Sequence, residues 1–242
     1  MIKDLVILRL LCVCVQIFTR SKMSLGKLIQ YHQGNQDFVW NPLFFISIGV
    51  NKFLKDKLGP EHSTTLDHTR FLETIDRARW MLRWGVSLQA LHTIRQNKGD
   101  FLTKVSACID LVYHVFDIGF FLQMIMPKTM KGYSGPLFAR ISCMCWFINN
   151  WLGIYKLVNR LQEITLNRTD DRTKGSPEDN KILKEVQTIK QNIGCLMVDS
   201  ILASNWASKK EFLHPYQLSV LGTCTGLINL KNHYHALEHH GY

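Results

Sequence analysis

The sequence lacks the short motifs that mark most enzyme active sites. It contains no Gly-x-Ser-x-Gly, no phosphate-binding glycine loop, no dinucleotide-binding glycine pattern and no His-Glu-x-x-His pair. Its closely spaced cysteines are Cys-x-Cys rather than Cys-x-x-Cys, and no histidine pair completes a zinc set. We therefore expect a protein that is not an enzyme and that has no cofactor and no metal site.

Signals for β-structure are also missing. No run alternates cleanly between apolar and polar residues, and no Asn-Gly or Asp-Gly hairpin turn occurs. Apolar residues, which make up 46% of the chain, gather in long blocks instead. The predicted fold class is all-α: a membrane-associated helical protein with amphipathic helices and one to three hydrophobic membrane segments.

The excess of basic residues predicts an anionic partner. The chain has 29 Lys and Arg against 19 Asp and Glu, a formal charge of +10. These bases flank the apolar blocks rather than forming one patch, which favours an anionic phospholipid membrane over nucleic acid. The seven cysteines lie mostly inside apolar blocks, and their odd number favours reduced thiols and a protein that faces the cytosol.

Composition divides the chain into six segments. In order, we predict an N-terminal extension, a cytosolic amphipathic-helix region, a hydrophobic helical hairpin, a charged linker, C-terminal membrane segments and a His-rich tail, at residues 1–22, 23–100, 101–158, 159–192, 193–231 and 232–242. Within them, helices are expected over 23–31 and 42–58, where Gly59-Pro60 ends the second. A third is expected through 71–95, with N-cap candidates at Ser63-Thr64-Thr65. The apolar blocks 105–126 and 137–158 are not clean spans, because both contain charged residues.

The segment 71–95 has the pattern of an amphipathic helix. At 3.6 residues per turn, Arg79 and Arg83 fall on one narrow polar wedge together with Asp76 and Ser87. A wide apolar arc covers much of the remainder and includes Trp80, Leu82, Trp84 and Leu88, with Arg77 at its outer part. A helix lying in a lipid interface and an ordinary core helix with a solvated strip both fit this pattern.

Two further patterns lie in the apolar blocks. Asp110, His114 and Asp117 form one stripe of a helix, which fits either an ion relay or, as we favour, a polar seam that faces the protein or the cytosol. Gly222 and Gly226 form a Gly-x-x-x-Gly motif, which lets two helices approach closely and predicts self-association.

Three stretches together resemble the peroxin-eleven family of peroxisomal membrane proteins. Residues 27–31 (Lys-Leu-Ile-Gln-Tyr) are similar to its N-terminal signature. Residues 77–85 (Arg-Ala-Arg-Trp-Met-Leu-Arg-Trp-Gly) resemble its amphipathic helix, and 215–228 its Gly-rich C-terminal membrane segment. The order and spacing fit over roughly residues 24–231, although 1–22 are extra and the family's Arg-Leu-Gly reads Arg83-Trp84-Gly85.

The resemblance implies a function in peroxisome elongation and fission. Members insert an amphipathic helix into the cytosolic leaflet, form homo-oligomers and recruit dynamin-related fission machinery. The implied location is the peroxisomal membrane, or the glycosomal membrane in a kinetoplastid, with the termini in the cytosol. The implied lipid-binding residues are Arg77, Arg79, Trp80, Leu82, Arg83, Trp84 and Leu88. The alternatives are a membrane pore or metabolite channel of the same organelle, and a soluble helical scaffold.

Overall fold

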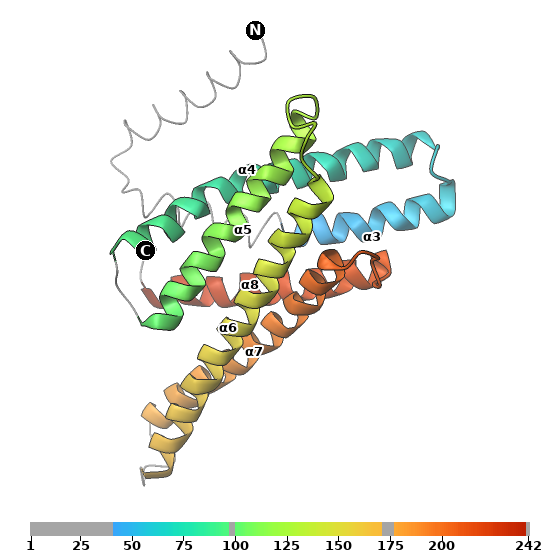
Figure 1. Cartoon of the computed structure of the whole chain (residues 1–242). Coiled ribbons are helices and arrows are strands. Elements are labelled where there is room, and N and C mark those ends of the chain that lie inside the picture. The colour runs from blue at the N-terminus through green and yellow to red at the C-terminus, as the bar shows by residue number, and fades with distance from the viewer. Residues whose placement is uncertain (1–40, 97–99, 171–176, 241–242) are drawn as a thin grey trace.

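The computed structural model describes residues 41–96, 100–170 and 177–240, and all regular structure in these ranges is helical (Figure 1). The helices are α3 (Asn41–Leu58), α4 (Ser63–Gln96), α5 (Phe101–Ile125), α6 (Gly135–Asp170), α7 (Pro177–Ala207) and α8 (Pro215–His240). The predicted all-α class is therefore confirmed for this part of the chain. The helix expected over 23–31 and the family signature at 27–31 lie outside the described residues.

Local sequence sets several helix ends. α3 ends before Gly59, whose φ of 89° lies in the left-handed region that glycine adopts without strain, and Pro60 follows. Asp100 caps α5, because its Oδ1 accepts a hydrogen bond of 2.9 Å from the backbone N–H of Thr103. Pro127 follows the end of α5, where the sequence predicts a stop.

The charged stretch 159–192 is not the linker that its composition predicts. α6 continues through it to Asp170, and α7 begins at Pro177. Arg160 of α6 donates hydrogen bonds of 3.1 and 3.2 Å to Oε1 of Glu185 on α7. The opposite charges therefore support an antiparallel pair of helices in place of a loop. The predicted His-rich tail likewise begins inside a helix, since α8 runs to His240.

The helices form two sets that cross one another. In the view of Figure 1, α3, α4 and α8 run roughly horizontally, whereas α5, α6 and α7 run obliquely. Contacts join α3 to both α4 and α8, α5 to α6, and α6 to α7, while α4 packs on α5 and α7 on α8. α3 and α8 lie side by side although they are distant in the sequence.

An aromatic stack joins the two sets. The ring of Trp206 on α7 stacks between Phe45 of α3 and Trp146 of α6, with centroid distances of 5.9 and 6.0 Å. Leu202 and Leu218 are buried beside this stack. The stack fixes the position of α3, α6 and α7 relative to each other, and it forms the main apolar core of the described residues.

Candidate functional site

Arg79, in the polar wedge of α4, lies against α3. Arg79 is only 6% exposed, and its guanidinium donates hydrogen bonds to Oδ1 of Asn41 at 2.8 Å and to Oδ1 of Asp76 at 3.1 Å. The same guanidinium lies over the ring of Phe44, 3.9 Å from its centroid. Arg79 was predicted to bind lipid phosphates, but in this arrangement its charge is used to hold α4 on α3. A helix wheel cannot locate the partner of a polar wedge, which is why the sequence pattern suggested solvent or lipid.

The other predicted lipid-binding residues are placed less completely. Arg77 is exposed and lies 3.7 Å from the carboxylate of Glu73, so its charge is available at the surface. The remaining five residues of the set lie on α4, but their side chains are outside the described part of the structure: Trp80, Leu82, Arg83, Trp84 and Leu88.

The two glycines of the Gly-x-x-x-Gly motif pack against α3 of the same chain. A Cβ atom at Gly222 would collide with the ring of Phe45, and one at Gly226 would lie 2.5 Å from Cγ of Pro42. The motif therefore permits the close helix approach that its spacing predicts. Its partner, however, is a helix within the chain, and this glycine face is not free to bind a second copy.

The stripe of Asp110, His114 and Asp117 faces inward. Asp117, which is 3% exposed, accepts a hydrogen bond of 2.8 Å from the hydroxyl of Ser142 on α6. The amide of Asn149 donates to Asp110 and accepts a bond of 3.1 Å from Ser106. The stripe is thus part of a polar seam between α5 and α6, as favoured from the sequence.

The outer faces of the same two helices are apolar. On α6, large apolar residues are exposed at successive steps of seven, four, three, four and three: Leu137, Met144, Ile148, Trp151, Tyr155 and Val158. On α5, Phe101, Val112 and Val115 are exposed in the same way, Val115 to 57%. This regular outer stripe was not recognised from the sequence, although its spacing was available there.

The α5–α6 hairpin therefore combines a polar seam inside with an exposed apolar stripe outside. Acidic and amide side chains meet inside it beside buried apolar residues such as Phe121 and Ile154, while aliphatic and aromatic side chains are exposed on its outside. In a soluble helix pair the apolar stripe would be buried, since its exposure to water costs free energy. α5 has 25 residues, which corresponds to about 37 Å, and among the described helices it alone is long and apolar enough to cross a hydrocarbon core of about 30 Å.

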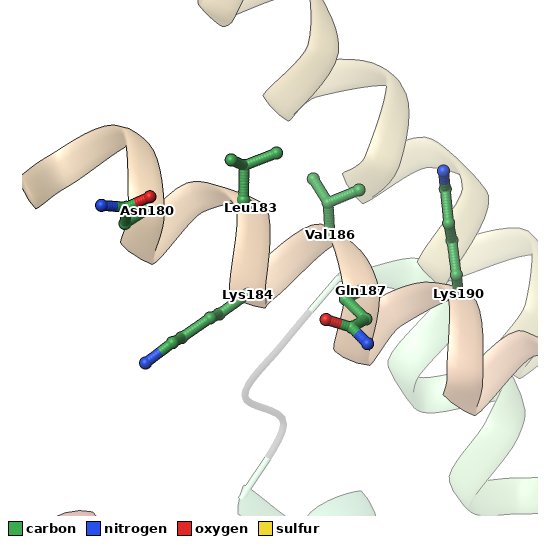
Figure 2. A pocket seen from close by; sticks show the side chains of 6 residues that line it. All are labelled: Asn180, Leu183, Lys184, Val186, Gln187 and Lys190. Carbon is green, nitrogen blue, oxygen red and sulfur yellow. The ribbon is translucent and has the colours of Figure 1, made fainter. Parts of the chain in front are cut away.

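The pocket shown in Figure 2 does not have the groups of an active site. The pocket in Figure 2 lies along one face of α7, and all its described lining residues belong to that helix: Asn180, Leu183, Lys184, Val186, Gln187 and Lys190. It brings together no nucleophile with a base. Among the described residues, no group of three His, Cys, Asp or Glu side chains could hold a metal ion.

The case for a function therefore depends on the polarity of these helix faces. No protein-family model, no curated protein and no solved structure matches this chain.

Proposed function

We propose that this chain is a peroxisomal membrane protein that remodels and elongates the membrane, and so promotes peroxisome proliferation and fission. The observation that carries the proposed membrane association is the exposed apolar stripe on the outside of the α5–α6 hairpin, which lies over a polar seam. Hydrocarbon is a favourable environment for the outer stripe of apolar side chains, whereas the acidic groups inside the hairpin are paired with Ser142 and Asn149. The assignment to peroxisomes and to elongation is supported by the resemblance of residues 77–85 and 215–228 to the peroxin-eleven family.

The proposed mechanism is a wedge formed by α4. The apolar arc that includes Leu82 and Leu88 would insert between the headgroups of the cytosolic leaflet and expand it relative to the other leaflet. Trp80 and Trp84 would lie at headgroup level, and Arg77 and Arg83 would attract anionic lipid. Arg79 is assigned a different role, because its side chain packs against α3 and would orient α4 without contact with lipid.

The alternative of a pore has less support. A path for ions would need polar side chains that line an open channel. The polar groups of the α5–α6 seam instead bond directly to one another across the helix pair, as Ser142 does to Asp117. Planar-bilayer conductance of the purified chain separates the two functions, because a remodelling protein raises no discrete conductance steps.

The proposal is tested with a fluorescent fusion of the whole chain in cells that carry a peroxisomal marker. The wild-type fusion is expected to coincide with the marker, and its overexpression is expected to elongate the organelles. Leu82→Glu with Leu88→Glu should still reach the organelle through the α5–α6 hairpin but should not elongate it, because charged side chains do not enter the leaflet.

A matched control places the same changes at the end of the α6–α7 pair. Leu166 and Leu183 are both exposed there, beside the charged residues that join the two helices. Leu166→Glu with Leu183→Glu should localise and elongate as wild type does. A diffuse wild-type signal would contradict the proposed location. Normal elongation by the Leu82→Glu, Leu88→Glu variant would contradict the wedge.

A further inference from the structure

α3 lies between two neighbouring helices and has one face left over. Asn51 accepts a hydrogen bond of 3.0 Å from Thr69 of α4, and Asn41 binds Arg79, so this face of α3 meets α4. Pro42, Phe45 and Gly49 meet α8, at Gly226, Gly222 and Ser219 respectively. The third face carries Ile46, Val50 and Phe53, which are 44, 40 and 52% exposed.

α8 has the same organisation. Its glycine face meets α3, and Leu218 and Leu221 pack with residues of α7 such as Leu202. Its remaining face exposes Val220 and Leu227, with Tyr216 at its beginning. Both members of the α3–α8 pair therefore present an apolar stripe that no described part of the chain covers.

The two stripes point to the same side of the pair. The residue pairs 45 with 222 and 42 with 226 show that the helices are antiparallel. The exposed stripe is rotated away from the contact face, in the direction of increasing residue number, by about 75° on α3 and by about 110° on α8. Because the helices run in opposite directions, these rotations bring both stripes to one side, and α4 and α7 lie on the other.

The opposite side of this layer is strongly charged. Asp67, Arg70 and Glu73 form a stripe on the N-terminal part of α4 that points away from α3, and all three are exposed. This charged stripe runs beside α3. If α3 crossed the hydrocarbon perpendicular to the membrane, the charged side chains of α4 beside it would also lie in the hydrocarbon, at a high cost in free energy. The arrangement instead fits a layer that lies flat, with the N-terminal part of α4 (residues 67–73) toward water and the apolar side of α3 and α8 toward lipid.

The lengths and the end residues agree with this orientation. The apolar part of α8, from residue 216 to 230, measures about 22 Å and is too short to cross a hydrocarbon core of about 30 Å. Lys57 follows the α3 stripe, and exposed Lys209 and Lys210 precede α8, where they would meet anionic headgroups. At the same end the hydroxyl of Tyr216 donates to Asp56 at 3.2 Å, a position typical of tyrosine at a membrane interface.

We propose that α3 and α8, which pack closely at Gly222 and Gly226, lie in the plane of one leaflet, and that their common apolar face contacts the acyl chains. The residues of this lipid-contact face are Ile46, Val50, Phe53, Val220 and Leu227. The inference rests on the proposed membrane location but not on the α4 wedge, and it adds a second element that occupies only one leaflet.

The test uses the full-length chain in vesicles of phosphatidylcholine and phosphatidylserine that contain a phospholipid with a diazirine at the middle of one acyl chain. After illumination, lipid adducts are mapped by mass spectrometry. Adducts are expected on the lipid-contact face, at Ile46, Val50 and Val220, and are not expected on the charged stripe at Arg70 or Glu73.

Variants at the lipid-contact face make the test specific. Val50→Asp with Val220→Asp should lose the adducts on α3 and α8 and keep those on the outer stripe of α5. Both sites are exposed, so the helices should fold as before. The control is Thr74→Asp on the exposed face of α4, which should leave the pattern of adducts unchanged.

The outcomes separate this inference from the proposed function. Adducts on α5 and α6 with none on α3 or α8 would overturn the inference and leave the membrane assignment standing. Crosslinks between two copies through Ile46 or Val220 would also overturn it, because the face would then cover a second chain. Adducts nowhere, with release of the chain by alkaline carbonate, would overturn both.

Discussion

Replacement of Arg79 by glutamine distinguishes a packing role for this side chain from a lipid-binding role. The buried guanidinium makes two hydrogen bonds and lies 3.9 Å from the centroid of the Phe44 ring. Hydrogen bonds to charged groups contribute about 1.5–3 kcal/mol each, and a desolvated cation–π contact about 2 kcal/mol. The desolvation of the charge offsets part of this sum. We expect Arg79→Gln to lower the free energy of unfolding by about 2–4 kcal/mol.

The assay is thermal unfolding of the purified chain in a mild detergent, followed by circular dichroism. For a chain of this size, the expected loss corresponds to a fall in Tm of roughly 5–15 °C. The loss should be nearly the same at low and high salt, because the ion pair with Asp76 is largely shielded from solvent ions. Arg77→Gln is the control, since its pair with Glu73 is exposed and should contribute less than about 1 kcal/mol.

The opposite pattern would refute the packing role. Suppose that Arg79→Gln has the same Tm as the wild type, but that its binding to anionic vesicles is weaker than that of the wild type at low salt and equal to it at high salt. Arg79 would then face lipid headgroups. In that case the described packing of α4 on α3 is not the arrangement of the protein on the membrane.

Three other changes test the remaining features. Gly222→Ala should lower the free energy of unfolding by about 1–3 kcal/mol, because its Cβ would meet the ring of Phe45. Gly194→Ala, whose Cβ meets nothing within 4 Å, should raise the free energy of unfolding by up to about 1 kcal/mol, and equal melting of the two variants would argue against the close packing of α8 on α3. Val115→Asp places a charge on the outer stripe of α5, at a cost of about 2.5–3.5 kcal/mol if that stripe lies in hydrocarbon. Alkaline carbonate should then extract more of the protein from membranes than it does of the wild type, and unchanged extraction would place this face of α5 in water. Hydrogen bonds from the Thr103 side chain and backbone hold the pKa of the Asp100 carboxyl below its usual value of 3.8. The stability that this cap contributes is therefore present above pH 3.8 and is lost as the pH falls through the lowered pKa of Asp100. Helicity should fall less with decreasing pH in Asp100→Asn, because asparagine still caps the helix but has no carboxyl group to protonate.

Local sequence signals were sufficient for most helix boundaries in the described residues. Gly59 and Pro60 marked the end of α3, and Ser63 the start of α4, because these residues act on the backbone beside them. The charged stretch 159–192 was misjudged because composition alone was used. Here α6 packs against α7, with Arg160 paired to Glu185, and composition does not show such contacts between residues 25 positions apart.

The candidate site depended more on contacts that sequence cannot show. The spacing of Asp110, His114 and Asp117 located the polar seam, since one helix face is set by periodicity. The spacing of Gly222 and Gly226 predicted a close helix approach, but it could not tell a helix of the same chain from a second copy. Asp76 is a partner of Arg79 within α4, but its other partners, Asn41 and Phe44, lie on α3, up to 38 residues away, and no pattern within α4 points to them.

The contact between α3 and α8 can form only late in the synthesis of the protein. Phe45 and Gly222 are separated by 222 − 45 = 177 positions, so α3 is complete long before its glycine partner leaves the ribosome. At about 5–20 residues per second, the delay is roughly 10–35 s. During this time the ring of Phe45 and the stripe of Ile46, Val50 and Phe53 have no α8 beside them, which calls for a chaperone or an early membrane contact at the N-terminal half. A ribosome-stalled chain that ends before residue 215 should accordingly crosslink to chaperones through α3, and the released full-length chain should not.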